Sequence, residues 1–418
     1  MIEIDALQTF ARDMLPALEQ EMRTVLAPPA ASPSLPSEPA TSLRSVQALS
    51  LPKGSAQAPN PQGGQTAPDP FYGMLHYHMG WVDAELRPAN VPNGKRIRPL
   101  LCLLTCQAAA ESVQVATRSG SYNSSSVQAR TWTPDTWTPE HPLAWQHALP
   151  AAAAVELLHN FSLIHDDIED ASPTRRGRDT LWKIWGVEQA INSGDALFAL
   201  AHLALSRLGD RGIGADIVLH ALRRFDQTCL HLTRGQHADI DFETRDQVSV
   251  AEYVEMIAGK TAALLSLSAE LGALVGGADP AVVHHYAAFG RDLGLAFQVK
   301  DDILGIWGDE AHIGKSAATD IAARKKTLPV LYALSQSPQL RQLYRQPQTG
   351  SDFVPGFVPG FVPQVMQLLD QSGARDFAGA RAAHYSQSAL DHLEAAQPAG
   401  AAGAALFQLA HMLLNRDF

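Results

Sequence analysis

The sequence predicts an all-α protein on two observations. From Phe71 onward, apolar residues recur at the three- and four-residue spacing of amphipathic helices. No convincing run alternates apolar and polar residues over the length of a β-strand. Hydrophobic residues make up 46% of the 418 residues, which is enough to form a sizeable core.

Helices in the main body, 71–418, are expected over 71–88, 96–111, 148–170, 179–185, 193–209, 213–235, 250–275, 280–305, 327–336, 364–372, 377–396 and 402–415. Pro173 is expected to end the third of these, because proline lacks an N–H and its ring blocks the preceding turn. Two insertions interrupt the pattern and are expected to be surface loops. The first, 112–147, is rich in Ser and Thr, and the second, 346–363, repeats Phe-Val-Pro-Gly.

The N-terminal part differs from the main body. Residues 1–26 carry the apolar stripe of an amphipathic helix, whereas Pro, Ala, Ser, Gln and Gly dominate residues 27–70 without any period. We expect 27–70 to be a flexible linker. It is interpreted as an insertion that the fold tolerates, or alternatively as a tether that lets the first helix dock on an unknown partner.

Composition excludes some classes of function. The net charge of −11 argues against a nucleic-acid binder, which needs basic surface to neutralise phosphates. Only three cysteines in a long chain fit a reducing cytoplasm, and Cys102 and Cys106 share an apolar helical face that suits core packing. The longest apolar stretch, 261–277, contains Glu270, so we expect a buried helix and not a membrane span.

Two aspartate-rich segments set in helical runs are the main candidates for a site. The first reads HDDIED from residue 165, and the second reads KDDILG from residue 300. Asp166 and Asp170 are one helical turn apart and project from nearly the same face. Their apolar neighbours place that face in a core, where carboxylates need cations. Other acidic residues, such as Asp239, Asp241 and Glu243, are interpreted as ordinary surface.

The ligand types favour magnesium. Carboxylate oxygens without a nearby cysteine suit Mg²⁺ better than zinc. Because Mg²⁺ readily completes its coordination with phosphate oxygens, two acidic clusters that face each other predict a diphosphate site inside a helical bundle.

Basic residues recur beside the acidic helices. Lys95 and Arg98 follow Gly94 at the expected start of a helix, where both can point at one anion. His159 lies two turns before Asp166 on the same side, a position where a histidine is usually a core residue. The further candidates are Arg175, Arg176, Lys260, Thr261, Gln298 and Lys315. Side chains of both signs suit a cavity that holds a metal-bound diphosphate.

The ordered motifs resemble those of the trans-isoprenyl diphosphate synthases, the polyprenyl synthetase family. The resemblance covers 71–418 without the two insertions, and rests on residues 94–99, 159–170, 175–177, 235–236, 260–261 and 297–302. It implies an isoprenoid-synthase-type helical bundle around a deep central cavity, usually a homodimer.

The resemblance also implies roles for single residues. The Mg²⁺ ligands would be Asp166, Asp170 and Asp301, with Asp167 and Asp302 as their supporting partners. The isopentenyl diphosphate site would consist of Lys95, Arg98, His159 and Arg176. The allylic diphosphate site would consist of Arg175, Lys260, Thr261, Gln298 and Lys315, of which Arg175 and Lys260 would act in catalysis with the metal ligands.

The reaction implied is head-to-tail condensation of isopentenyl diphosphate with an allylic diphosphate. The alternatives are a class I terpene cyclase and a non-catalytic partner subunit of a prenyl synthase. An aromatic residue five positions before the first Asp, here Phe161, with the small Ser162 after it, implies a product limit of C20 rather than C15. Phe161 can equally be ordinary core packing. The family's second motif usually ends in a third Asp, but this chain has Gly305, and Asp309 lies one turn further on.

Overall fold

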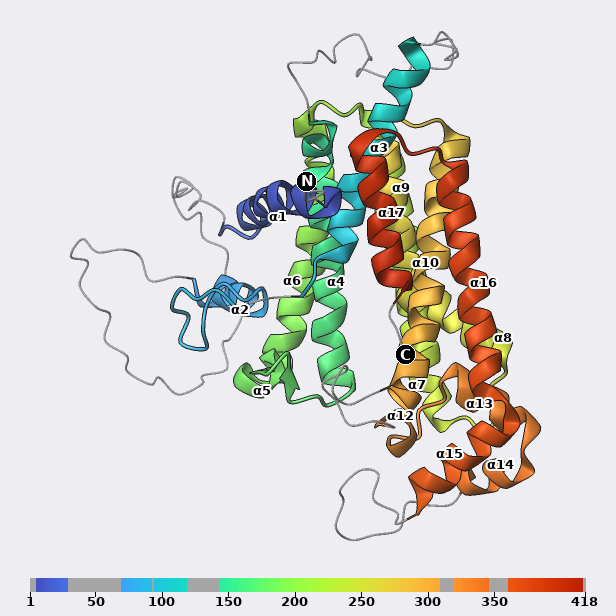
Figure 1. The fold of residues 1–418 in the computed structure, drawn as a ribbon. Helices are drawn as coiled ribbons and strands as arrows, with labels where there is room; N and C mark the ends of the chain where they lie inside the picture. The colour runs from blue at the N-terminus through green and yellow to red at the C-terminus, as the bar shows by residue number, and fades with distance from the viewer. Residues whose placement is uncertain are drawn as a thin grey trace, which may run out of the picture.

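A computed structural model describes residues 5–28, 69–91, 94–118, 143–308, 319–345 and 360–415. Within these ranges the protein is a bundle of helices with a single two-stranded antiparallel hairpin, so the all-α prediction is confirmed (Figure 1). The hairpin pairs β1 (Thr174–Arg175) with β2 (Arg178–Asp179).

The helices follow one another along the chain as α1 (Ala6–Val25), α2 (Pro70–His78), α3 (Ile97–Arg118), α4 (Leu149–Glu169), α5 (Leu181–Trp185), α6 (Val187–Ser206), α7 (Ala215–Thr244), α8 (Val250–Ile257), α9 (Ala263–Val275), α10 (Pro280–Trp307), α12 (Thr319–Ala322), α13 (Leu328–Gln336), α14 (Pro338–Arg345), α15 (Phe361–Ser372), α16 (Ala374–Ala395) and α17 (Gly400–Leu414). Short 3₁₀ turns are η3 (Ala144–Ala148) and η4 (Gly209–Arg211). A π-helical turn, η5 (Ala258–Ala262), joins α8 to α9.

Most expected helices form, but several boundaries differ. The helix expected over 71–88 stops at His78, because the chain turns at Gly80 with a φ of 80°. The expected insertion 112–147 is helical at both ends, since α3 continues to Arg118 and η3 begins at Ala144. Helix α15 starts at Phe361, inside the expected loop 346–363. The remainder of both insertions, and most of the expected linker 27–70, lies outside the described residues.

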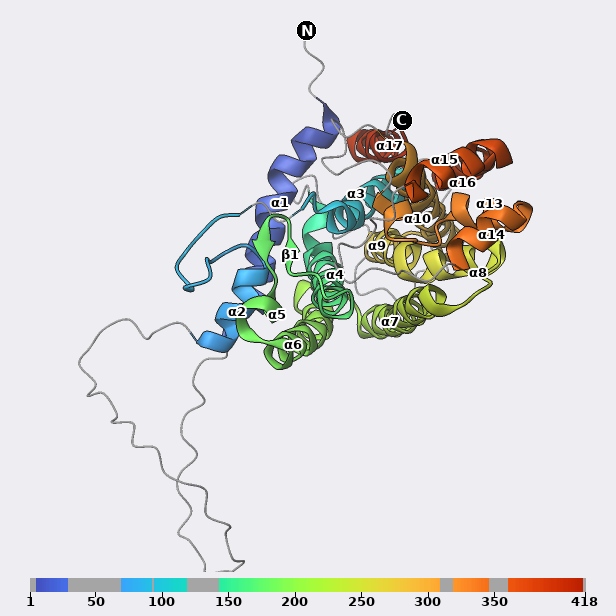
Figure 2. The ribbon, with the colours of Figure 1, turned by 90° about the horizontal axis from the view of Figure 1, so that it is seen from below.

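Helix α9 lies at the centre of the bundle, with α3, α4, α7 and α10 packed around it (Figure 2). Small residues allow these helices to approach closely. A Cβ on Gly272 would lie 2.2 Å from the carbonyl oxygen of Cys102, and one on Gly276 would lie 2.5 Å from that of Cys106. Both cysteines are buried and unoxidised in this contact, as expected for core residues.

Two helical segments, Ile97–Thr117 and Val250–Val275, are long and apolar enough to span a membrane. Their most apolar windows are 67% and 61% buried inside the bundle. Both segments are therefore apolar because they are core helices of the bundle, which agrees with the expectation for 261–277.

Helix α1 packs on the body of its own chain. Its apolar stripe, which includes Met14, Leu18 and Met22, is 0–1% exposed against α3, α4, α6 and α17. Its one deeply buried acid, Glu21, accepts hydrogen bonds from Arg207 Nε at 2.9 Å and Arg211 Nη2 at 2.6 Å. The apolar face that the alternative interpretation assigned to an unknown partner is therefore covered by the bundle itself.

The burial of α1 makes a stability prediction. Leu18→Ala should lower the free energy of unfolding by about 2–5 kcal/mol, because it leaves a cavity between α1 and the bundle. Urea denaturation followed by circular dichroism measures this change. The matched control is Gln8→Ala on the exposed face of α1, which should stay within about 0.5 kcal/mol. Equal stability of the Leu18 variant and the wild type would contradict the packing described above.

Candidate active site

The two aspartate-rich segments lie near the ends of two helices that finish at the same end of the bundle. Asp166 is in the last turn of α4 and Asp170 is its C-cap residue, while Asp301 lies within two turns of the end of α10. Figure 1 shows these helix ends together at the lower end of the bundle, near the C-terminal end of α7. The fold therefore brings the two segments to one region, although 130 or more residues separate them in sequence.

Lys260 lies between the first segment and α7. Its Nζ forms an ion pair with Asp239 of α7, and the charges of Asp166 and Asp170 act on it as well. Burial lowers the pKa of Lys260, but the three carboxylates outweigh burial and leave the pKa raised. Lys260 is thus a cation held among acids, as a residue that binds a metal-complexed anion must be.

A continuous set of hydrogen bonds connects this region to the second segment. Thr261, the residue after Lys260, donates from Oγ1 to Gln298 Oε1 at 2.9 Å. Gln298 Nε2 in turn donates to Asp302 Oδ1 at 3.2 Å. Three residues of the expected allylic site are therefore adjacent in space, and Gln298 bridges Thr261 to the second acidic pair.

The second aspartate of each pair is anchored by the protein. Asp167 accepts a hydrogen bond from Arg175 Nε at 2.8 Å. Asp302, which is 3% exposed, accepts hydrogen bonds from the Tyr253 hydroxyl and from the backbone N–H of Leu328 at 3.1 Å. Burial raises the pKa of Asp302 to about 7, against these donors. This anchoring fits the supporting role implied for Asp167 and Asp302.

The charge on Asp166 calls for a counter-cation. Burial raises its pKa to about 6, with Lys260 and Arg175 acting in the opposite direction and Asp170 and Glu169 adding to the rise. A divalent cation would relieve this repulsion, and all the donors are oxygens, which suits Mg²⁺. Among the described residues, no group of three His, Cys, Asp or Glu side chains is arranged to hold a metal ion by itself. Water and substrate oxygens would have to complete its coordination.

Two glycines bring Lys260 to its place. A Cβ on Gly235 of α7 would lie 2.3 Å from the backbone nitrogen of Lys260, and a Cβ on Gly259 would lie 2.6 Å from the carbonyl oxygen of His231. The two backbones touch because neither residue has a side chain. The contact occurs at the π-helical turn η5, which changes the direction of side chains within a helix that would otherwise be regular.

Asp239 was expected to be ordinary surface, and its side chain is 40% exposed, but it also makes a contact that this expectation did not include. It forms the ion pair with Lys260, and Gln236, one turn earlier, donates to Glu169 at 2.6 Å. The available signal was the pair Gly235-Gln236, which belongs to the ordered motifs and places Asp239 one turn further along the same face.

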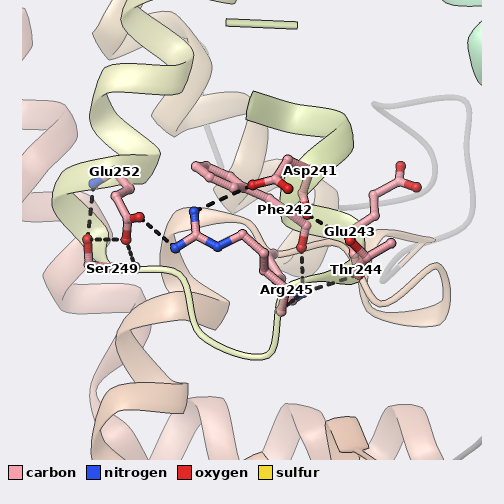
Figure 3. A network of polar contacts seen from close by, with 8 residues as sticks. Asp241, Phe242, Glu243, Thr244, Arg245, Ser249 and Glu252 are labelled. Atoms are coloured by element: carbon pink, nitrogen blue, oxygen red, sulfur yellow. Dashed lines mark hydrogen bonds and ion pairs between the residues drawn. The ribbon is translucent and has the colours of Figure 1, made fainter. Parts of the chain in front are cut away.

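Asp241 behaves as expected and belongs to an exposed network at the end of α7 (Figure 3). Arg245 joins Asp241 at 3.6 Å to Glu252 at 2.7 Å, and Glu252 closes a capping box with Ser249. Lys326 adds hydrogen bonds to backbone carbonyls of residues 242, 243 and 245. These contacts fix the turn that leads from α7 into α8 and η5.

A second, basic cluster gathers around His159, two turns before Asp166 on α4. Arg98 Nη1 donates to His159 Nε2 at 3.2 Å, so that nitrogen carries no proton. Burial, and then the charges of Arg98, Arg176 and Arg175, hold the pKa of His159 well below its usual range. Three arginines thus gather around a neutral histidine, an arrangement that suits an anion with several oxygens.

Gly94 allows Arg176 into this cluster. The glycine has a φ of 76°, and a Cβ on it would lie 2.8 Å from Arg176 Nη2. The adjacent Arg96 is tied to Glu156 of α4 at 2.6 Å, which anchors the motif, and Lys95 beside it is exposed. A small cavity of about 40 Å³ lies next to the cluster and is lined by residues that include His78, Asp167, Arg175, Arg176 and Arg178.

Sequence reasoning missed several members of the site. Tyr253 and His78 were not singled out, because each contacts its partners across the fold and neither lies in a charged motif. Burial and then the charge of Arg175 lower the pKa of His78 to about 3. The expected substrate ligand Lys315, together with Asp309, lies outside the described residues.

Phe161 projects from α4 toward α6. Its ring centroid is 5.1 Å from that of Phe198 and 4.7 Å from that of His165, and it is partly buried against the core. Ser162 turns its hydroxyl back to the carbonyl of His159 at 2.9 Å. The ring of Phe161 and the hydroxyl of Ser162 are thus both oriented by contacts with their neighbours.

Comparison with known proteins identifies the family. A family model described as polyprenyl synthetase matches residues 81–354. A (2E,6E)-farnesyl diphosphate synthase of Mycobacterium tuberculosis is 35% identical over 347 residues, covering 82% of this chain and 86% of the relative. A geranylgeranyl diphosphate synthase of the same organism is 39% identical over 290 residues, covering 68% and 73%. The crystal structure of a polyprenyl synthetase from Streptomyces coelicolor A3(2) superposes with a TM-score of 0.71 at 30% identity and covers 98% of both chains.

These matches agree with the bundle architecture and with the order of the motifs. The chain belongs to the polyprenyl synthetase family, the isoprenyl diphosphate synthases, and is a prenyltransferase with an all-α fold.

Proposed function

We propose that the protein condenses isopentenyl diphosphate head-to-tail with an allylic diphosphate, in the presence of Mg²⁺, to give a short-chain product of C15–C20, mainly geranylgeranyl diphosphate. The observation that carries the proposal is a pair of chemically different clusters of charged residues beside α4, each of which suits a diphosphate. One combines carboxylates with Lys260, and the other consists of Arg98, Arg176 and the neutral His159. A reaction between two diphosphates, of which only one loses its diphosphate group, needs such a pair.

In this proposal Asp166, Asp170 and Asp301 hold Mg²⁺, which would supply the positive charge that stabilises a departing diphosphate. Lys260 and Arg175 contact the allylic diphosphate from the protein side, with Thr261, Gln298 and Lys315 completing that subsite. Asp302 and Asp167 keep their neighbours in position through Tyr253 and Arg175.

The basic cluster holds the second substrate. Lys95, Arg98, His159 and Arg176 bind isopentenyl diphosphate, because cations without a nearby metal suit a diphosphate that is not cleaved. Holding the double bond next to the reacting carbon makes attack effectively intramolecular. Departure of the diphosphate would leave a positive charge on the allylic carbon, and the apolar interior of the bundle would keep water away from this carbocation.

The two alternatives explain less of the site. A class I terpene cyclase has no use for an isopentenyl diphosphate subsite, yet the Arg98–His159 contact and the room that Gly94 leaves for Arg176 are both built. A non-catalytic partner subunit has no use for the acidic ligands, yet Asp166 and Asp170 are both present beside Lys260.

A homodimer is part of the proposal, and the cytoplasm is the proposed location. Large apolar side chains are exposed on α6 and α7, which lie along one side of the bundle in Figure 2. They are Val187, Ile191, Leu203, Leu219, Leu230 and Ile240, and Leu230 is 65% exposed. A second copy of the chain would cover such a surface.

The activity is tested with purified protein, Mg²⁺, labelled isopentenyl diphosphate and each allylic primer in turn. Incorporation of label into C15 or C20 chains is expected. Asp166→Asn should lower kcat by about 100-fold or more, because it removes a metal ligand. The exposed carboxylate variant Asp391→Asn on α16 is the control and should match the wild type. Cyclised hydrocarbon or no turnover at all would overturn the proposal in favour of one alternative.

Product length is tested through Phe161. Phe161→Ala should shift the product toward chains longer than C20. In this proposal the ring of Phe161, five residues before Asp166 on α4, blocks further growth of the chain, and the substitution removes it. Thin-layer or mass-spectrometric analysis of the dephosphorylated alcohols measures the distribution. The matched control is Phe377→Ala at the distant α13–α16 contact, where the ring stacks on Tyr332. An unchanged distribution in the Phe161 variant means that its ring only packs the core.

The proposed dimer surface is tested by replacing an exposed apolar residue on it with a charged one. Leu230→Glu should produce monomers in analytical ultracentrifugation, because it buries an unpaired carboxylate from each copy in the interface. Met412→Glu changes an equally apolar residue, 49% exposed on α17 away from α6 and α7, and should remain dimeric. A dimer that survives the Leu230 change would place the interface elsewhere.

A further inference from the structure

Gly305 stands where the resemblance described above implies a third aspartate in the second segment, and its missing side chain leaves a specific space. It lies inside α10, two residues before the helix ends at Trp307. A Cβ on Gly305 would lie 2.2 Å from Asp320 Oδ2 and 2.9 Å from Asp320 Cγ. The carboxylate of Asp320, from helix α12, therefore fills the space that a side chain at 305 would enter.

Asp320 is held in this place by its own short helix. The next residue, Ile321, is 0% exposed in an apolar cluster with Ile306 of α10. The backbone N–H of Lys325 donates to the carbonyl of Asp320 at 2.8 Å, which closes the turn behind it. The side chain of Asp320 is 22% exposed. The burial of Ile321 and the hydrogen bond from Lys325 therefore hold the backbone of Asp320 next to Gly305.

The carboxylate also belongs electrostatically to the second segment. Its negative charge acts on Asp302, one of whose oxygens Tyr253 already occupies. Asp320 forms an ion pair with Lys325, whose Nζ is 4.0 Å away and whose side chain is 66% exposed, so that pair is weak. Asp320 therefore brings negative charge to the wall formed by α10.

We propose that Asp320 serves as the third carboxylate of the second acidic segment, and that Gly305 is required because it admits this carboxylate. The inference rests on the proposed function, since it deepens the role of that same wall toward Mg²⁺. Asp320 acts there as a positioning residue, which sets the charge and orientation of the wall next to Asp301.

Gly305→Ala tests the space directly. The added Cβ must displace the carboxylate of Asp320 whatever its role, because the two would lie 2.2 Å apart. Alanine in place of glycine favours the helix, but the displacement opposes that gain, so the melting temperature of the free protein does not separate the two interpretations. If Asp320 supports the second acidic segment, the concentration of Mg²⁺ needed for half-maximal activity should rise, and if it has no such role, that concentration should not change.

The main test replaces the carboxylate itself. Asp320→Asn should raise the half-maximal Mg²⁺ concentration about tenfold or more, a loss typical of groups that support metal ligands. The KM for isopentenyl diphosphate should stay unchanged, because the basic cluster is separate. Asp320→Glu should recover most of the Mg²⁺ affinity. Asp391→Asn is the control for loss of a carboxylate elsewhere.

A readout without turnover separates this inference from the proposed activity. Mg²⁺ with inorganic pyrophosphate should raise the melting temperature of the wild type, and the rise should be smaller in Asp320→Asn and Gly305→Ala. The reciprocal exchange Gly305→Asp with Asp320→Gly should restore the rise, because it returns one carboxylate to the same space from the other helix.

Equal rises in the wild type and in both single variants would overturn the inference, as would an unchanged Mg²⁺ requirement in Asp320→Asn. A wild type that responds to magnesium pyrophosphate but does not elongate prenyl chains would overturn the proposed function alone. If Asp320→Asn does not fold, Asp320→Glu and Gly305→Ala carry the same comparison.

Discussion

The repulsion among partly buried carboxylates is the physical constraint on which the site depends. Asp166 lies in the last turn of α4, where burial and Asp170 disfavour its charged form and Lys260 and Arg175 favour it. A protein gains no stability from such an arrangement by itself. It becomes useful when a divalent cation and the oxygens of a diphosphate complete it. The rest of the fold can be understood as the means by which these charges are held together.

The fold meets that constraint with close backbone contacts and with anchors behind the ligands. The contact of Gly235 with η5 brings Lys260 to Asp239 and Asp166, and the network around Arg245 fixes the turn from which η5 follows. Arg175 and Tyr253 hold the second aspartate of each pair, so the first keeps a defined orientation. Arg175 comes from the hairpin that directly follows α4, eight residues after Asp167, whereas Tyr253 comes from α8, 49 residues before Asp302.

The sequence predicted the helical bundle, the two acidic segments and most of the basic residues, because these depend on local periodicity and on ordered motifs. The ion pair of Asp239 was missed, although Gly235-Gln236 marked the same helix face, because its partner Lys260 comes from a different helix. The packing of α1 could not be predicted, because a Pro- and Ser-rich segment separates α1 from the body. Helix 71–88 was overextended, since buried residues such as Trp81 continue the apolar pattern into a turn. The contact of Asp320 with Gly305 could not be predicted from the sequence, because it depends on how α12 packs against α10.

A direct measurement of the metal positions tests the central claim. Crystals grown with Mn²⁺ in place of Mg²⁺, together with pyrophosphate, would reveal the ions by anomalous scattering. The account predicts ions between Asp166 and Asp170 on one side and Asp301 on the other, with pyrophosphate oxygens bridging them next to Lys260. Ions bound to one helix alone, or pyrophosphate held at the Arg98–His159 cluster with no metal between the acidic segments, would contradict it.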